Sequence, residues 1–316
     1  MNYLTIFDHN YLAKGLALCR SLNRKTPEST IFILATSSTA FDVLTLMKDG
    51  LGNCTIVSIS EVEAYYPKLL RIKSERNLGE YSWTCKGPFI QYCFDIFNLS
   101  VCSYIDADLF CYCDPTPVFE ELKSNDVLLT LHDFSDQYNL GETNGWHCAQ
   151  FLTFKNSENG RAILKWWTEL CIQWCYGYVE PGKFGDQKYL DFFQTNWNGI
   201  ADIRTGLFVA PWNIGKYVKN KMPKTFVFYH FHFLKNTWLG PIGEFYFGPY
   251  DYTRTQIKQI YKPYLEELKI IDREVRNLFP DIDSLGSRSE KISILQLFMH
   301  IAKNIFNIKK KIWIKR

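Results

Sequence analysis

The stretch "VCSYIDADLF" (residues 101–110) is an apolar run that ends on two acidic residues, Asp106 and Asp108, with one alanine between them. In an extended chain, side chains two positions apart point to the same side. Two neighbouring carboxylates repel each other unless a cation neutralises them or one of them is protonated. Hard divalent ions prefer oxygen ligands and often bind together with a phosphate. The pair therefore suggests metal-assisted phosphate chemistry, although acids at this spacing also cap ordinary turns.

Strand-like and helix-like runs alternate on both sides of this stretch. We predict strands at residues 3–7, 30–36, 54–59, 101–107, 126–132, 148–154 and 224–233, and helices at residues 11–22, 40–47, 87–97, 117–122, 157–176 and 184–193. From about residue 253 onward the pattern is helical. Such alternation favours an α/β fold with a parallel sheet. Ligands of these sheets collect at the carboxyl ends of the strands, where Asp106 and Asp108 are expected.

Composition narrows the range of functions. The chain has 316 residues, 47% of them hydrophobic, which is enough for one large domain or one domain with an appendage. A net charge of +3 is too small to indicate a nucleic-acid-binding protein, so no nucleic-acid partner is expected. The ten cysteines show no C-x-x-C spacing, which favours free thiols over a structural zinc site. With no signal-peptide pattern at the start and no apolar stretch of spanning length, we expect a cytoplasmic protein.

Three classes of enzyme place paired acids after an apolar strand. Aspartate-nucleophile phosphatases carry the pair on the first strand, whereas here it follows several strand–helix units. Nucleotidyltransferases need a Gly-rich, Arg-containing loop after the first strand, and "DHNYLAKG" (residues 8–15) does not fit. A metal-dependent glycosyltransferase uses the acids to hold an ion that neutralises a leaving diphosphate. We favour this class; an Asp-x-Asp phosphohydrolase and a non-catalytic, membrane-associated nucleotide-sugar-binding protein remain the alternatives.

Seven stretches are together more specific than the acidic pair. They are "FDHNYLAKGLALCRSL" (7–22), "EYSWTCKGPFIQYCF" (80–94), "YIDADLFCYCDPTPVFEEL" (104–122), "CAQFLTFKNSENGRAILKWW" (148–167), "WCYGYVEPGKFGDQKYLDFF" (174–193), "APWN" (210–213) and "FYHFHFLK" (228–235). In this order they resemble bacterial GT-A fold glycosyltransferases related to glycosyltransferase family eight, over most of the chain up to about residue 240. The resemblance implies a Rossmann-like α/β fold with a mostly parallel central sheet and a helical C-terminal extension. It implies a catalytic domain at residues 1–250 and a helical region at residues 251–316.

The resemblance also implies a donor site, expected to take a UDP-sugar. Asp8, Asn10 and Tyr11, in the loop after the first strand, would hold the base; a tyrosine ring can stack on it and an acid can accept its N–H. Lys86 occupies a position from which a basic residue reaches the phosphates, and Trp83 is placed to stack on a sugar. A solvated Lys86 and a core Trp83 are the alternative interpretations.

The implied metal site would hold Mn²⁺ or Mg²⁺. Asp106 and Asp108 would bind the ion, with Asp106 also near the ribose. Related enzymes supply a third ligand from a histidine on a late strand; this matches His230, with His232 on the same face as the alternative. Lys235 would contact the diphosphate.

The "FGDQ" stretch (residues 184–187) resembles the segment of the family that lies beside the donor sugar. Asp186 would hold sugar hydroxyls and Gln187 would lie beneath the anomeric carbon. Because an amide is a poor nucleophile, a front-face mechanism with retention is expected. The acceptor, a glycan or a lipid-linked oligosaccharide, is expected near His132, Asp133 and Trp146.

This chain departs from the family pattern at two places. Cys148 and Gln150 replace an Asn-x-Gly that contacts donor sugar and acceptor in relatives, and Phe233 replaces a glycine. The identity of the sugar therefore cannot be transferred from the family.

The last segment, residues 290–316, has Ile294, Phe298, Ile301, Ile305 and Ile308 at helical spacing. After Glu290 it carries seven basic residues and no acid. A basic amphipathic helix suits an anionic membrane surface. We therefore expect peripheral attachment to the cytoplasmic face of a membrane, with a helix docked on the protein as the alternative.

Overall fold

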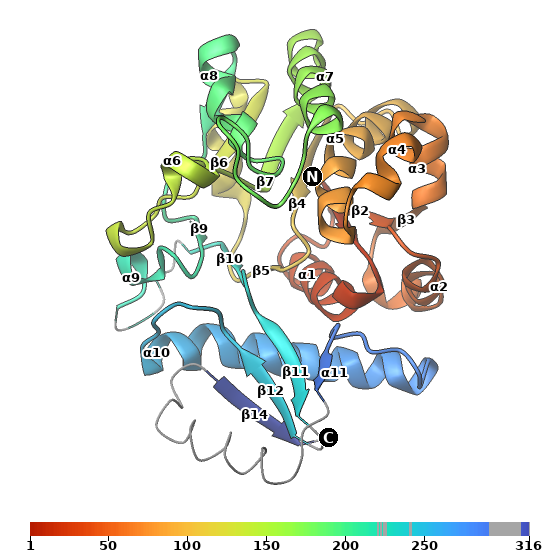
Figure 1. The fold of residues 1–316 in the computed structure, drawn as a ribbon, viewed down its shortest axis with the longest axis vertical. Coiled ribbons are helices and arrows are strands. Elements are labelled where there is room, and N and C mark those ends of the chain that lie inside the picture. The colour runs from red at the N-terminus through yellow and green to blue at the C-terminus, as the bar shows by residue number, and fades with distance from the viewer. Residues whose placement is uncertain (220, 222, 224–225, 240–241, 291–310, 316) are drawn as a thin grey trace.

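The computed structural model describes residues 1–219, 221, 223, 226–239, 242–290 and 311–315. Its central sheet has the strand order β3-β2-β1-β4-β7-β6-β8 (Figure 1). The strands are β1 (Asn2–Phe7), β2 (Thr30–Ala35), β3 (Cys54–Ser58), β4 (Val101–Ile105), β6 (Val127–Leu131), β7 (His147–Lys155) and β8 (Ile200–Asp202). Strand β1 runs parallel to β2 and β4, as β2 does to β3 and β6 to β8, whereas β7 is antiparallel to β4 and β6. The predicted α/β fold with a mostly parallel sheet is confirmed.

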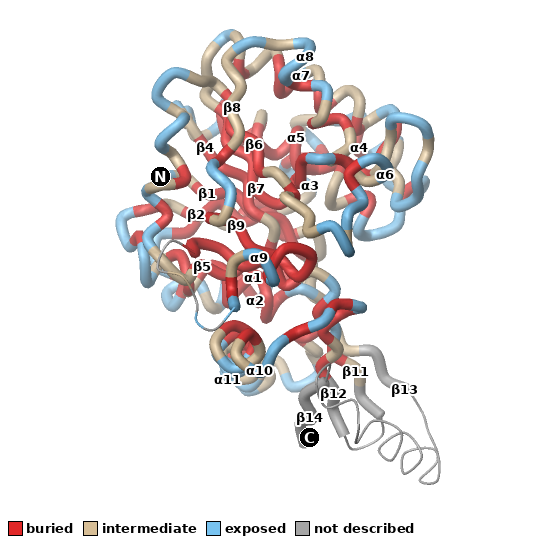
Figure 2. The backbone as a smooth tube through the Cα atoms, turned by 90° about the vertical axis from the view of Figure 1, so that its left-hand side faces the viewer, coloured by how far each residue is buried: buried red, intermediate tan, exposed pale blue. Residues whose placement is uncertain are grey.

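Strand β1 shows how the sequence builds the layers of the fold. Side chains alternate between the two faces of a strand, so Tyr3 and Phe7 are buried on one face and Leu4 and Ile6 on the other. The first face packs against α1 (Leu12–Lys25), α2 (Ser38–Met47) and α11 (Lys262–Leu278). The second packs against α3 (Ile59–Tyr65), α4 (Lys68–Ile72), α5 (Leu78–Ile96) and α7 (Glu158–Gln173). Figure 2 shows the resulting buried layer along the sheet, with exposed residues on the outer loops.

Helix α5 begins earlier than the predicted residue 87. Asn77 accepts a hydrogen bond from the Glu80 backbone N–H, and the Glu80 side chain accepts one from the Asn77 backbone N–H. This reciprocal capping box fixes the start of a helix and satisfies two backbone donors that would otherwise lack partners. The longer helix brings residues 78–86 to the same end of the sheet as Asp106.

A small sheet joins two distant parts of the sequence, in the order β5-β10-β9. Strand β5 (Leu109–Cys111) pairs antiparallel with β10 (Phe228–His230), which pairs in parallel with β9 (Phe208–Val209). The strand predicted at residues 224–233 is therefore shorter than expected. Its register sets His230 opposite Leu109, one residue from Asp108.

The predicted helical region is confirmed over α10 (Arg254–Gln256), the π-helical η7 (Ile257–Tyr261) and α11. Beyond α11 the helical prediction is wrong at two described segments, because β13 (Arg288–Glu290) and β14 (Lys311–Lys315) are strands. They pair with the hairpin of β11 (Lys235–Leu239) and β12 (Ile242–Tyr246), in the order β13-β11-β12-β14. Backbone pairing with this hairpin, which the local sequence pattern does not reveal, outweighs the helical periodicity. The predicted basic amphipathic helix otherwise lies on residues 291–310, outside the described residues.

Short elements complete the fold. They are η1 (His9–Tyr11), η2 (Lys48–Leu51), η3 (Lys73–Glu75), η4 (Thr116–Lys123), η5 (Asp136–Tyr138), α6 (Gly141–Asn144), η6 (Lys188–Phe192), α8 (Phe193–Asn196) and α9 (Ile214–Tyr217). All ten cysteines are free thiols, as predicted. Within the ranges described above, no helix combines the length and the apolarity needed to cross a bilayer.

Candidate active site

A cleft of about 760 Å³ lies at the carboxyl ends of β1 and β4. Its walls come from the loop after β1, the first turn of α1, helix α5, the turn between β4 and β5, the start of β7, and residues 184–187. Residues 230–236 and the loop after α11 close it from the C-terminal side. This is the edge at which parallel α/β sheets bind ligands. Residues between positions 6 and 286 of the sequence thus contribute to one site.

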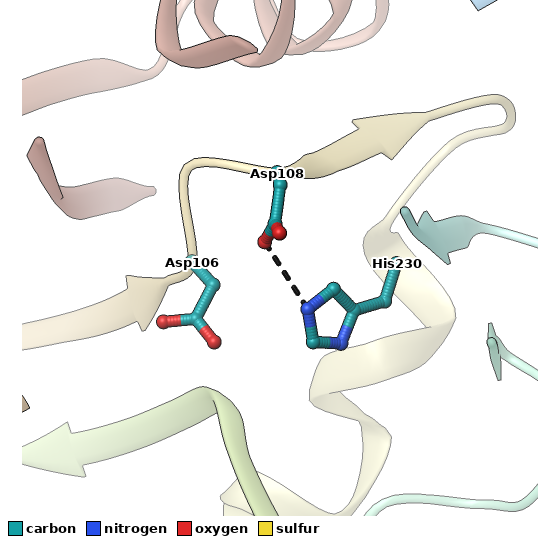
Figure 3. A group of neighbouring side chains, drawn as sticks. All are labelled: Asp106, Asp108 and His230. Carbon is teal, nitrogen blue, oxygen red and sulfur yellow. Dashed lines mark ion pairs between the residues drawn. The ribbon is translucent and has the colours of Figure 1, made fainter. Parts of the chain in front are cut away.

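Asp106, Asp108 and His230 meet in this cleft (Figure 3). One ligand atom from each lies within 4.8 Å of the other two. The turn after β4 is held by a hydrogen bond from the Asp106 N–H to the Gln150 carbonyl (2.8 Å). The His230 Nε2 atom lies 3.1 Å from the Asp108 Oδ1 atom. Two carboxylates and an imidazole at this spacing fit a divalent ion such as Mn²⁺ or Mg²⁺.

The protonation of this group suits metal binding. Burial acts to raise the pKa of Asp108, but the charge and the hydrogen bond of His230 outweigh it and hold the pKa well below its usual range. Asp108 is therefore an ionised carboxylate at neutral pH. Burial, together with His230, lowers the pKa of His232 to about 3, so its ring is neutral. His232 lines the cleft and packs on Trp212, whereas His230 is the histidine that joins the two acids.

Lys86 lies between two acidic residues of the cleft, Asp106 and Asp186. Its side chain is almost fully buried, and its Nζ atom lies 3.0 Å from Asp106 Oδ1 and 2.9 Å from Asp186 Oδ2. It also donates to the Ala149 carbonyl (3.0 Å), while the Tyr104 hydroxyl donates to Asp106 (2.8 Å). Burial acts to lower the pKa of Lys86, but the two carboxylates raise it above its ordinary value. The ammonium is therefore charged, and the alternative of a solvated Lys86 is wrong.

The loop before Asp186 takes a conformation that its sequence permits. Gly185 has a φ of 53°, a left-handed value that glycine adopts without strain. The Trp167 indole N–H donates to the Asp186 carbonyl (2.8 Å), which fixes the loop against α7. The Gln187 amide donates to the Asn144 carbonyl (2.8 Å). Asp186, Gln187 and Trp83 all line the cleft.

The loop after β1 forms the opposite end of the cleft. The Asp8 carboxylate accepts hydrogen bonds from the backbone and side-chain N–H groups of Asn10, both at 2.9 Å. Asp8, Asn10 and Tyr11 line the cleft, and so does the exposed Lys235. The Tyr11 side chain is 43% exposed, so its ring can meet a ligand.

Two of the three predicted acceptor residues lie outside this lining. The Asp133 carboxylate faces away, toward Lys216 (2.9 Å) and the hydroxyl of Tyr217. The Trp146 side chain is exposed but does not line the cleft. His132 does line it, with its ring stacked on Phe134 at 4.5 Å. Burial, with the nearby histidines, lowers the pKa of His132 to about 3, so this ring is also neutral.

Sequence reasoning missed three parts of the site. Lys14 lines the cleft with a side chain that is only slightly exposed, and burial lowers the pKa of its ammonium. A lysine inside the apolar run "YLAKGLALC" is the signal that could have revealed it. Tyr104 was part of the stretch first quoted, yet its bond to Asp106 was not expected. Leu285 and Gly286 reach the cleft from beyond α11, and no local pattern marks them.

Gly286 shows how closely this last loop approaches the loop after β1. Its φ is 58°, and a Cβ atom built on it would lie 2.3 Å from the Asn10 carbonyl oxygen. The neighbouring Ser284 carbonyl accepts a hydrogen bond from the Ala13 N–H (2.9 Å). Asp283 holds the loop in shape by accepting hydrogen bonds from the backbone N–H groups of Leu285 (3.1 Å) and Ser287 (3.0 Å).

Solved structures share this architecture at low sequence identity. The galactosyltransferase LgtC, in complex with donor and acceptor sugar analogs, matches with a TM-score of 0.53 and 15% identity, over 85% of this chain and 96% of LgtC. The apo form of the glycosyltransferase GlyE from Streptococcus pneumoniae TIGR4 matches with a TM-score of 0.51 and 13% identity, over 88% of this chain and 63% of GlyE. The fold is therefore the GT-A fold of glycosyltransferases.

Sequence comparison identifies nearer relatives. No family model matches the chain. The uncharacterized protein YfnD of Bacillus subtilis (strain 168) is 26% identical over 296 residues, which cover 89% of this chain and 92% of YfnD. The uncharacterized protein YfnF of the same organism is 30% identical over 308 residues, which cover 91% of this chain and 98% of YfnF. The chain therefore belongs to the same protein family as YfnF of Bacillus subtilis.

Proposed function

We propose that this protein is a metal-dependent glycosyltransferase related to glycosyltransferase family eight. It would move a sugar, a hexose in our proposal, from a nucleoside-diphosphate donor, most simply a UDP-sugar, to a cell-surface glycan or a lipid-linked oligosaccharide. The observation that carries the proposal is the group of Asp106, Asp108 and His230 at the carboxyl edge of a GT-A sheet. A pair of carboxylates with one imidazole, in a cleft large enough for a nucleotide sugar, supports this reaction more than any other.

The residues present fit a divalent ion. Asp106, Asp108 and His230 would hold it, and the low pKa of Asp108 keeps that ligand charged across the neutral range. When bound, Mn²⁺ or Mg²⁺ would supply positive charge to the departing diphosphate.

The side chains of the cleft would divide the remaining work. Asp8, Asn10 and Tyr11 would bind the base, and Lys235 the diphosphate. Lys86 holds Asp186 in a fixed position, so that its carboxylate can accept hydrogen bonds from sugar hydroxyls.

The bond changes follow from the chemistry of Gln187. Its amide does not attack the sugar, so the acceptor oxygen would approach the same face that the diphosphate leaves. The bond from the anomeric carbon to the diphosphate oxygen breaks, the bond to the acceptor oxygen forms, and the acceptor proton passes to the diphosphate. Retention of configuration results. The acceptor would enter beside His132, with Asp133 and Trp146 outside the cleft and available only to a longer glycan.

A ligand screen tests this function directly. Melting temperatures would be measured with UDP, GDP, ADP, CDP and their sugars, with and without Mn²⁺. We expect stabilisation that needs both a nucleotide and the ion, because ligands that bind only the folded state raise its stability. Release of phosphate from an aryl phosphate without any nucleotide effect would instead indicate a phosphohydrolase. Nucleotide-sugar binding with neither transfer nor hydrolysis would indicate a binding protein.

We also propose peripheral attachment to the cytoplasmic face of a membrane, through the basic residues of segment 291–316. Each basic residue near an anionic surface contributes up to about 1 kcal/mol. Because β14 pairs with β12, substitution is a cleaner test than deletion. Changing Lys291, Lys303, Lys309 and Lys310 to glutamine should abolish co-sedimentation with phosphatidylserine vesicles. Unchanged co-sedimentation, or equal binding to phosphatidylcholine vesicles, would reject an electrostatic attachment.

A further inference from the structure

Lys14 is a buried cation that the proposed mechanism does not yet use. Its side chain lines the cleft from the first turn of α1, and the residue is only 9% exposed. The Nζ atom donates one hydrogen bond, to the Leu234 carbonyl at 2.9 Å, and lies 4.4 Å from the centre of the Tyr11 ring. Across the described part of the chain, no carboxylate forms an ion pair with it.

This arrangement leaves donors without acceptors. An ammonium group has three N–H donors, and Lys14 uses one of them on Leu234. Burying a charge is costly unless it is paired, and lysines are almost never buried without a partner. The charge of Asp108 acts on Lys14, but among the described residues no carboxylate contacts its Nζ atom directly. The unused N–H groups of Lys14 are therefore available to an anionic ligand.

The position of Lys14 identifies the kind of anion. The Leu234 carbonyl lies four residues after His230, so Lys14 is bonded to the segment that continues from the metal ligand. The Tyr11 ring, assigned above to the base, is its other neighbour. Asp8, Asn10 and Tyr11 line what we call the base end of the cleft, and Asp106, Asp108 and His230 form what we call the metal group. An anion that reaches Lys14 would thus lie between the base end and the metal group. In a nucleoside-diphosphate sugar, the group between the base-bearing ribose and the sugar is the diphosphate.

We infer that Lys14 binds the diphosphate of the donor directly, as a second cation beside the metal group. The inference rests on the proposed function and names a further residue of that site. Its two unused N–H groups would bond phosphate oxygens, and its charge would help stabilise the diphosphate as it leaves. Lys14 would therefore make the site select nucleoside diphosphates over nucleosides.

Two substitutions separate this role from a structural one. In Lys14→Gln the amide can still donate to the Leu234 carbonyl, but the positive charge is gone. Lys14→Arg keeps the charge and several donors. Lys68→Gln, on an exposed lysine paired with Glu169, is the matched control. The full chain, with saturating Mn²⁺, would be titrated with UDP, GDP, ADP, CDP, uridine and inorganic pyrophosphate.

A hydrogen bond to a charged group contributes about 1.5–3 kcal/mol, which corresponds to roughly 10- to 100-fold in affinity. We expect Lys14→Gln to lose about that factor for the preferred nucleoside diphosphate and for pyrophosphate, with uridine binding unchanged. Lys14→Arg should retain most of the affinity, and Lys68→Gln all of it.

Other results would overturn the inference. Wild-type affinity of Lys14→Gln for diphosphates would show that Lys14 does not touch them. An equal loss for uridine and diphosphate, or loss of folding in both Lys14 variants, would show a structural role through residues 231–235. If the wild-type chain binds none of the four diphosphates with Mn²⁺, the proposed function itself fails, which is a distinct outcome.

Discussion

Lys86 and Lys14 are both buried cations that line the cleft, but their surroundings differ. Lys86 touches two carboxylates and a carbonyl, so the sugar end of the cleft (Lys86, Asp106 and Asp186) has its charges paired within the protein. Lys14 touches one carbonyl and a ring and forms no ion pair among the described residues, although the charge of the nearby Asp108 favours its ammonium form. We call this region (Lys14, Asp108 and His230) the phosphate end, after the proposed function. The comparison suggests that the ion pairs of the sugar end form without a ligand, whereas the direct partners of Lys14 at the phosphate end would come from a bound ligand. The predictions below test this difference.

Removing the charge of Lys86 should have the largest effect. In Lys86→Met, Asp186 loses its cation while it remains buried, and breaking a buried pair in this way costs about 3–5 kcal/mol. We expect a loss of that size in the free energy of unfolding, measured by urea denaturation. Asp186→Asn with Lys86→Met should recover part of it, because the uncompensated carboxylate is gone. A stable Lys86→Met protein would show that the sugar end is not held by this ion pair.

The phosphate end should respond in ligand binding more than in stability. Asp108→Asn keeps the shape of the side chain but removes a charged ligand from the metal group. Since even partners behind a metal ligand affect affinity by roughly 10- to 100-fold, we expect at least about 100-fold weaker Mn²⁺-dependent nucleotide binding by calorimetry. The melting temperature without ligands should also fall, because the depressed pKa of Asp108 means that its ionised form stabilises the folded chain. Normal Mn²⁺-dependent binding by this variant would place the ion elsewhere.

The base end of the cleft offers a smaller test. In Gly286→Ala, the new methyl group would meet the Asn10 carbonyl at a backbone angle that alanine rarely adopts. Strain of this kind costs about 1–3 kcal/mol. We expect weaker binding of uridine and of UDP by a similar factor, since the loop that holds the base must shift. Gly182→Ala, also at a left-handed angle but with open space around it, is the control. An effect confined to UDP would mean that this loop acts on the phosphates.

His147 provides a paired cation outside the cleft that can be titrated. Its ring nitrogens lie 3.1 Å from Asp191 and 3.0 Å from Asp202, and Lys188 also contacts Asp191. Burial acts to lower the pKa of His147, but these two acids raise it to about 9. Because the folded value exceeds the unfolded value of about 6.5, the stabilisation is complete below pH ~6.5 and is lost as the pH rises through about 9.

The measurable consequence is a decline in unfolding free energy over that range, on the order of 3 kcal/mol. His147→Gln, which cannot be charged, should flatten the decline. A wild-type curve that is level from pH 6.5 to 9 would contradict the ion pairs at His147.

Sequence reasoning succeeded where the deciding interactions are local or repeat along the chain. The alternation of strands and helices predicted the parallel sheet. The acids at the end of a strand, with a histidine taken from the family resemblance, predicted the group that Asp106, Asp108 and His230 form. It failed where pairing joins distant segments. Lys14 and Leu234 are 220 residues apart, and neither neighbourhood reveals the bond. The strands at 288–290 and 311–315 were predicted as helix because their partner hairpin is not visible in their own periodicity.

The contact between Gly286 and Asn10 joins the far part of the chain to its beginning. Residues that follow the last long helix are therefore a wall of the cleft. Shortening the protein at residue 250, as is common when a tail hinders crystallisation, would remove this wall. An inactive fragment made in this way would say nothing about the proposed membrane attachment.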